Sequence, residues 1–312
     1  MLTRRSSDNR SPDKQAQHRR LTALPHYGNG VTPGLPLALG AMLCFGVSDI
    51  IYKRGAAAGI KAGDFLMLQA WIFCPGVTLY AWLSGNLDPH LSALWGALAG
   101  AFLFVALYNF TQSLHGGAVS TNAPIFRLNF TITAALAILI LHESLTVPKA
   151  IALASALVAV WLLLAEAGSE RGKFSFASLG RVLLATVTMA LTNLFYKIGL
   201  QQGAVPETMV AAQAWTFCSL ATLFGFLREG RIWIPPRGWS YAAAAALGLF
   251  GAFVLLMHAL ALGPASVLVP VAQMSFVITA LFGIAVFRER VDLRKCAGLA
   301  IAAVALVLFA VS

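Results

Sequence analysis

Residues 120–141 read STNAPIFRLNFTITAALAILIL, twenty-two mostly apolar residues that are long enough to cross a bilayer as a helix. Arg127 lies a third of the way in, at a depth where a charge costs about 2.5 to 3.5 kcal/mol of insertion free energy. Pro124, one turn earlier, removes a backbone donor and loosens the helix. A helix with this much polarity at membrane depth must face protein or water, so we expect it to line a site.

The composition places the chain in a membrane. Of its 312 residues, 59% are hydrophobic and only 11% are charged, and the mean hydropathy is +0.77. The formal net charge of +10 would suit a nucleic-acid-binding protein, but the basic residues lie in the N-terminal tail and in short loops, without an aromatic-lined groove. We therefore expect the lipid bilayer, and no nucleic acid, as a partner.

Apolar runs of membrane-spanning length alternate with short loops, which predicts an all-α, polytopic membrane protein. We expect a disordered basic tail over residues 1–34, a first five-helix repeat over 35–165, an inter-repeat loop over 166–177 and a second repeat over 178–312. The ten expected transmembrane helices cover residues 35–57, 65–84, 91–114, 120–141, 147–165, 178–200, 207–227, 239–262, 266–287 and 293–311.

The two halves of the chain are repeats of one another. The sequence QAWIFC at residues 69–74 recurs as QAWTFC at 213–218, and the same offset of 144 relates Asp49 to Asn193. Because each repeat has an odd number of spans, the second must be inverted in the membrane, the architecture of alternating-access transporters. Further along, the offset is 146 and relates Pro124 to Pro270, Phe130 to Phe276, Thr133 to Thr279 and Glu143 to Glu289.

Short motifs in both halves resemble one known family. In the second half these are ALGPAS at 261–266, VPV at 269–271, FRERV at 287–291 and Gly298, and in the first half the segments 117–124 and 141–146. They resemble the EamA family of the drug/metabolite transporter superfamily. The sequence departs from the family pattern at His142 and Arg288, where a glycine is more usual, and Arg127 has only Gln273 at the matching position.

The resemblance implies a central cavity walled by spans 1 to 4 and 6 to 9, with spans 5 and 10 packed outside. It also implies cytoplasmic termini and a cargo of amino acids, other small metabolites or drugs, often moved outward. The loop charges disagree, since the positive-inside rule favours both termini outside. We follow the family topology and expect a multi-pass protein of the cell membrane, the bacterial inner membrane, with cytoplasmic termini.

Asp49 is the one acidic residue well inside a span, near the expected midplane. Lys53 follows one turn later and Tyr52 is also in reach, so Asp49 either satisfies a structural contact or carries a proton or ligand. Arg127 presents five donors in a fork that suits carboxylate or phosphate. It either receives an anionic substrate group or makes a structural pair, with Asp49 as the candidate partner.

Other polar side chains at membrane depth are further candidates for a substrate site, with helix packing as the alternative for each. A lone histidine in an apolar helix is more often structural than a proton relay, and the repeated tryptophans favour packing. The candidates beside Arg127 and Asp49 are Trp71, Asn109, Gln112, Asn122, Asn129, Asn193, Trp215, His258 and Gln273.

Several alternatives lose support from the sequence. His142 and Glu143 begin a sequence like a zinc-protease motif, but the second histidine would fall at position 146, which is threonine, so we expect no metal. We assign Glu143 to capping the next helix. The four cysteines have no CxxC spacing and are interpreted as buried thiols. Gly96 and Gly100 allow either close helix packing or a homodimer.

We conclude that the sequence predicts a secondary transporter of small metabolites, not an enzyme, working by alternating access without a cofactor. Export is favoured over uptake, and Asp49 is the candidate for proton coupling. A zwitterionic substrate such as an amino acid would find a partner for each end in Asp49 and Arg127. The alternative is a flippase of lipid or lipid-linked headgroups on the same fold.

Overall fold

The computed structural model describes residues 32–60, 62–88, 90–116, 119–164, 176–229, 238–287 and 293–312. Within these ranges every regular element is a helix, as expected. Of the expected tail only residues 32–34 fall inside the described ranges, and of the inter-repeat loop only 176–177.

Among the described helices, nine segments of at least 18 residues are long and apolar enough to cross a membrane. Val147–Leu163 is a shorter apolar helix, and we count it as the fifth of ten spans. The first repeat contains α2 (Leu35–Ala57), α3 (Ala62–Leu83), the short 3₁₀ helix η1 (Leu91–Ala93), α4 (Leu94–Gly116), α5 (Val119–Arg127), α6 (Asn129–Ile140) and α7 (Val147–Leu164). The second contains α8 (Phe176–Gln201), α9 (Pro206–Glu229), α10 (Gly238–Leu262), α11 (Ala265–Gln273), α12 (Ser275–Phe287) and α13 (Leu293–Ala310).

The repeats run in opposite directions through the bundle. The backbone nitrogen of Thr32, just before α2, donates to the carbonyl of Ala310 at the end of α13, so the first helix starts where the last one ends. The end of α8 lies at this same face, because the Lys197 ammonium donates to the carbonyl of Gly263, just after α10. We call this face the terminal face; it holds residues 32–34, 84–88, 90, 141–146, 202–205, 263–264 and 311–312.

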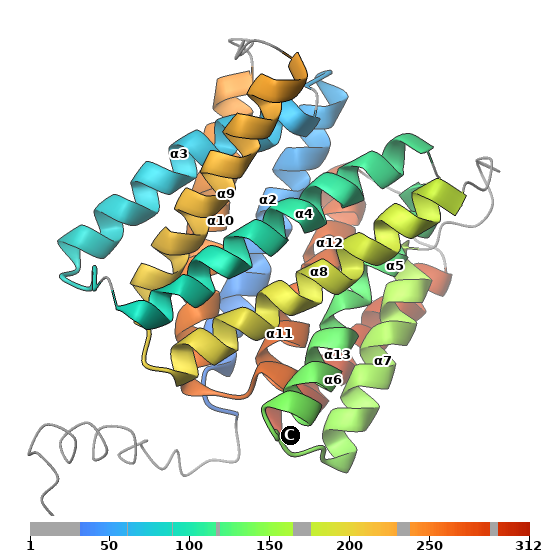
Figure 1. Cartoon of the computed structure of the whole chain (residues 1–312). Helices are drawn as coiled ribbons and strands as arrows, with labels where there is room; N and C mark the ends of the chain where they lie inside the picture. The colour runs from blue at the N-terminus through green and yellow to red at the C-terminus, as the bar shows by residue number, and fades with distance from the viewer. Residues whose placement is uncertain are drawn as a thin grey trace, which may run out of the picture. The chain divides into compact units, whose positions relative to one another are not determined.

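The contacts between helices connect eight of the ten spans into a closed ring of neighbours. The other two, α7 and α13, lie together at one side of the bundle (Figure 1). Around the ring, α2 packs on α10, α10 on α3, α3 on α9, α9 on α4 and α4 on α8. From α8 the ring continues through α5 and α6 to α11 and α12, and back to α2. The two helices outside it, α7 and α13, pack mainly on each other. The family resemblance implied this placement of spans 5 and 10 outside the other eight.

The fourth and ninth spans are each broken in two, whereas we expected single helices over 120–141 and 266–287. The breaks fall at Leu128 and Met274, which occupy the same position in the two repeats. Leu128 donates its backbone N–H to the carbonyl three residues back instead of four, which ends α5 with a tight turn. Pro124 and Pro270, one turn before each break, lack the donor that would reinforce the helix there.

Close helix contacts inside the ring depend on small residues. A Cβ on Gly96 would lie 2.6 Å from the carbonyl oxygen of Met209, and one on Gly100 would lie 2.4 Å from that of Gln213. These glycines therefore let α4 approach the backbone of α9 within the chain, the first of the two uses that the spacing allowed.

The outer surface of the described helices carries many exposed large apolar side chains, which suits contact with lipid. The cysteine expectation was wrong in part. Cys74 is buried, but Cys44 and Cys218 are half-buried and Cys296 is exposed. Cys296 lies on α13, which packs mainly on α7 outside the ring.

Candidate functional site

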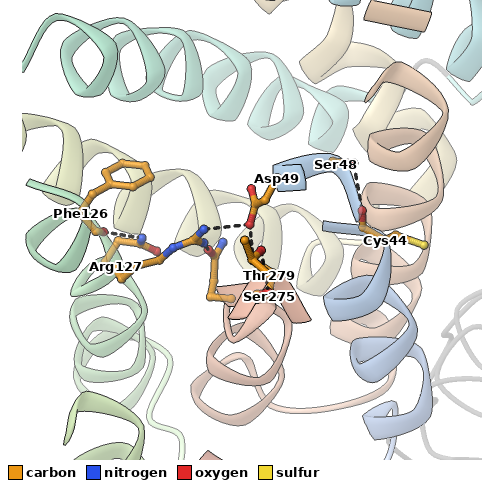
Figure 2. Close-up of polar contacts among 9 residues, drawn as sticks. Cys44, Ser48, Asp49, Phe126, Arg127, Ser275 and Thr279 are labelled. Atoms are coloured by element: carbon orange, nitrogen blue, oxygen red, sulfur yellow. Dashed lines mark hydrogen bonds and ion pairs between the residues drawn. The ribbon is translucent and has the colours of Figure 1, made fainter. Parts of the chain in front are cut away.

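The structure joins Arg127 and Asp49 in an ion pair at membrane depth (Figure 2). The Nη2 atom of Arg127, the last residue of α5, lies 3.0 Å from Oδ2 of Asp49 on α2. The two side chains are 19% and 32% exposed, so water can reach the pair. Tyr52, one of the neighbours suggested for Asp49, donates instead to Gln69 on α3, and the side chain of Lys53 lies outside the described residues.

Gln273 completes the contacts of Arg127. Its Oε1 atom accepts a hydrogen bond from Nη1 of Arg127 at 3.3 Å. The two residues are related by the offset of 146, so a residue here touches its own counterpart in the other repeat. Such a contact occurs only close to the pseudo-twofold axis between the repeats, which places the ion pair beside that axis.

The breaks in the fourth and ninth spans both lie beside the ion pair of Arg127 and Asp49. Arg127 and Gln273 end α5 and α11, and Asn129 and Ser275 begin α6 and α12. The Ser275 hydroxyl donates to Oδ2 of Asp49 at 2.9 Å, so the carboxylate sits at the positive end of the α12 dipole. Discontinuous spans at matching positions of inverted repeats are the usual location of a transporter's binding site.

A second cluster of polar side chains lies between the first turns of α6 and the helix α8. The Asn129 amide donates to the carbonyl of Phe126 at 2.7 Å, and the Asn193 amide donates to the Thr133 hydroxyl at 3.4 Å. All three side chains of this group, Asn129, Thr133 and Asn193, are fully buried. Their role in the structure is to hold the broken fourth span against α8.

The structure places the remaining candidates away from the ion pair. Asn122 is buried and donates to the Ser113 carbonyl and the Ser178 hydroxyl, so it connects three helices. Asn109 donates to a carbonyl of its own helix. Gln112 is half-buried on α4, His258 contacts Glu207 at 3.3 Å, and the indoles of Trp71 and Trp215 bond across the packing of α3 and α9.

A further polar cluster closes the terminal face. The two oxygens of Glu143 accept the backbone N–H groups of Ala265 and Ser266, each at 2.8 Å, at the start of α11. The Lys149 ammonium, which is buried, donates to the Ser144 carbonyl at 2.6 Å and to the Ser266 hydroxyl at 3.0 Å. Glu143 thus caps a helix of the other repeat, not the helix that follows it in sequence. Neither spacing nor composition signals this partner.

The loop that carries Glu143 includes the departure from the family pattern. His142 has a φ of 54°, in the left-handed region that glycine adopts without strain. This backbone conformation explains why a glycine is usual at this position.

The site can offer one cation and one anion to a small molecule. Among the described residues, no group of three or more His, Cys, Asp or Glu side chains is placed to hold a metal ion. The ion pair itself can recognise charged groups.

Comparisons with known proteins agree with this geometry. The model of the EamA-like transporter family matches residues 32–165 and again 178–311. An uncharacterized transporter in the cobO 3' region of a Sinorhizobium species is 28% identical over 134 residues, which cover 41% of this chain and 93% of that protein. The relative is therefore about as long as one repeat.

A solved structure supports the fold. A crystal structure described only as that of a protein aligns with a TM-score of 0.75 at 14% identity, over 88% of this chain and 95% of that one. With the family model matching both repeats, the function follows at the level of the family. The chain is a membrane transporter that belongs to the EamA-like transporter family.

Proposed function

We propose that this chain is a secondary transporter that moves small zwitterionic metabolites, such as amino acids, by alternating access. The observation that carries the proposal is the partly exposed ion pair between Arg127 and Asp49, located where two broken spans meet. A zwitterion offers a carboxylate for the guanidinium fork of Arg127 and an ammonium for Asp49.

Binding by exchange of partners keeps both charges satisfied. An unpaired charge at this depth is costly, and a neutral ligand that entered between Arg127 and Asp49 would leave both without an oppositely charged partner. A zwitterion replaces one ion pair with two, so the charges of the site remain neutralised throughout. Charge balance at the pair favours amino-acid-like substrates over neutral or singly charged ones.

The same pair supports coupling to protons. Protonation of Asp49 removes the negative partner of Arg127 and so alters substrate affinity, which is the linkage that proton-driven transport needs. We propose outward transport across a bacterial inner membrane, with the termini in the cytoplasm, following the family resemblance.

The test is flux in proteoliposomes. A mixture of radiolabelled L-amino acids is supplied to purified protein reconstituted in both orientations, with and without a pH gradient. Arg127→Gln, which copies Gln273, is expected to abolish flux while the protein still inserts. Arg294→Gln is the matched control, because it removes an arginine on α13 that contacts Trp161 and lies outside the ring. Flux at the parental rate in Arg127→Gln would overturn the proposal.

A further inference from the structure

The packing of α3 on α9 includes two hydrogen bonds that the symmetry between the repeats relates to one another. The indole N–H of Trp71 donates to the Thr222 hydroxyl at 2.8 Å, and the indole N–H of Trp215 donates to the Thr78 hydroxyl at 3.0 Å. The offset of 144 turns Trp71 into Trp215 and Thr78 into Thr222, so each bond is the image of the other. We call this surface, formed by these four residues with Cys74 and Cys218, the α3–α9 seam.

Cys74 and Cys218 lie at the centre of the seam. Each is the counterpart of the other at the offset of 144. Cys74 lies between Trp71 and Thr78 on α3, and Cys218 lies between Trp215 and Thr222 on α9, so the two mirrored bonds place the cysteines opposite one another. Cys74 is 1% exposed, whereas Cys218 is half-buried and lies on α9 one turn after Trp215, which is 55% exposed. The pseudo-twofold axis therefore passes between the two thiols at one side of the ring and between Arg127 and Gln273 at another.

The symmetry between the two repeats determines which contacts are present in both states of an alternating-access cycle. If alternating access works by an exchange of conformations between the repeats, each contact in one state becomes its symmetry image in the other. A contact between a residue and its own counterpart is its own image, and the two Trp–Thr bonds are images of each other. The α3–α9 seam is then the same in both states. This step rests on the proposed function.

The terminal face behaves in the opposite way. The bond from the Ser266 amide to Glu143 becomes, under the same exchange, a contact between positions 120 and 289. Residue 289 lies outside the described residues, but its position in the sequence is enough to show that the image is a different contact. The Glu143 contact must therefore open while the α3–α9 seam stays closed.

We propose that Cys74 and Cys218 are a dithiol site that a peroxide oxidises to a disulfide, and that this bond joins the repeats without arresting transport. The more exposed Cys218 reacts first, and its sulfur takes one oxygen as the peroxide O–O bond breaks and water leaves. The Cys74 sulfur then displaces this oxygen as a second water. One S–S bond forms, two thiols are oxidised and one peroxide is reduced to two waters.

The experiment uses the full chain with Cys44→Ser and Cys296→Ala, so that only the pair in the seam remains. Hydrogen peroxide is added to protein in proteoliposomes, and peptide mapping by mass spectrometry measures the Cys74–Cys218 disulfide. Cys218→Ser is the control that cannot form it. Two readouts are compared before and after oxidation: flux of the L-amino acid mixture, and hydrogen exchange of the peptide that contains the Ala265 and Ser266 amides.

A second cross-link supplies the contrast. Ser144 and Ser266 contact one Lys149 ammonium, so cysteines at both positions are close enough for a short bifunctional thiol reagent. In a background without native cysteines, this link is expected to stop flux and to slow exchange of the Ser266 amide by about ten-fold or more. The Cys74–Cys218 disulfide is expected to leave both quantities within about two-fold.

Failure to detect the disulfide after peroxide treatment overturns the dithiol site. If the Cys74–Cys218 disulfide slows hydrogen exchange at Ser266 and a reducing agent reverses the effect, the α3–α9 seam opens when the terminal face opens. That result overturns the inference that the seam is the same in both states. Absence of flux in the reduced protein counts against the proposed function instead, and in that case the exchange measurement still decides whether the seam stays closed.

Discussion

The carboxylate of Glu143, in a loop of the first repeat, accepts the backbone N–H of Ser266, in the first turn of α11 of the second repeat, at 2.8 Å. Together with the bond from Ala265, it satisfies two of the free amide donors at the start of that helix. The contact joins the two repeats at the terminal face.

Replacement of Glu143 by glutamine should loosen the terminal face. Glutamine offers one neutral acceptor where the carboxylate offers two charged ones, and we expect a loss of about 1–3 kcal/mol of local stability. Hydrogen exchange of the peptide that contains Ala265 and Ser266 should accelerate accordingly. Asp88→Asn is the control, because it removes an exposed carboxylate of the same face. Equal exchange rates in the two variants would contradict the capping role.

Lys197→Met should lower the melting temperature of the purified protein. The Lys197 ammonium is buried and donates to the carbonyls of Leu260 and Gly263 at 2.7 and 2.6 Å, where α10 ends. Methionine fills the same space but leaves both carbonyls without a donor, at a cost of about 1–3 kcal/mol. Arg181→Met, on an exposed face of the same helix, is expected to have a smaller effect. The prediction is wrong if both variants melt together.

Gly100→Ala should destabilise the bundle by about 1–3 kcal/mol, because the new methyl group would lie 2.4 Å from the backbone oxygen of Gln213 and force α4 away from α9. Gly180→Ala is the control and should stabilise the protein. This glycine, on α8, has no atom within 4 Å of the added Cβ, and alanine is the better helix former there. Thermal melts in detergent should move in opposite directions for the two variants.

Asp49→Asn, which copies Asn193, should remove the dependence of flux on a pH gradient. The amide cannot bind a proton in this range and leaves Arg127 without its negative partner. We expect flux to fall by about ten-fold or more, equivalent to at least about 1.4 kcal/mol. Asp49→Glu keeps a titratable group and should retain a response to pH. Gradient-driven flux that persists in Asp49→Asn would exclude the coupling role.

Much of the fold follows from local properties of the sequence. Apolar length gives the ten spans, and the repeated motifs give the inversion, because both signals are contained within single segments. The pairing of Arg127 with Asp49 was one of two alternatives left open, since charges at membrane depth require partners.

The rest depends on contacts between distant segments. The sequence predicted one continuous helix over 120–141, but α5 ends at Arg127 and α6 begins at Asn129. Likewise, the capping role of Glu143 could be expected, whereas its partner at Ser266 could not, because 123 residues separate them. Such pairs are decided by how the repeats pack, which no local pattern records.

The contact of Arg127 with Gln273 requires two repeats that differ in sequence. Two identical halves would place equal numbers of each charge at their shared axis, so two copies of one sequence cannot place a single guanidinium opposite a single carboxylate there. A dimer of identical one-repeat chains would hold two arginines at this axis or none. In this chain both charged residues lie in the first half, and the second half has two neutral amides, Asn193 and Gln273, at the matching positions.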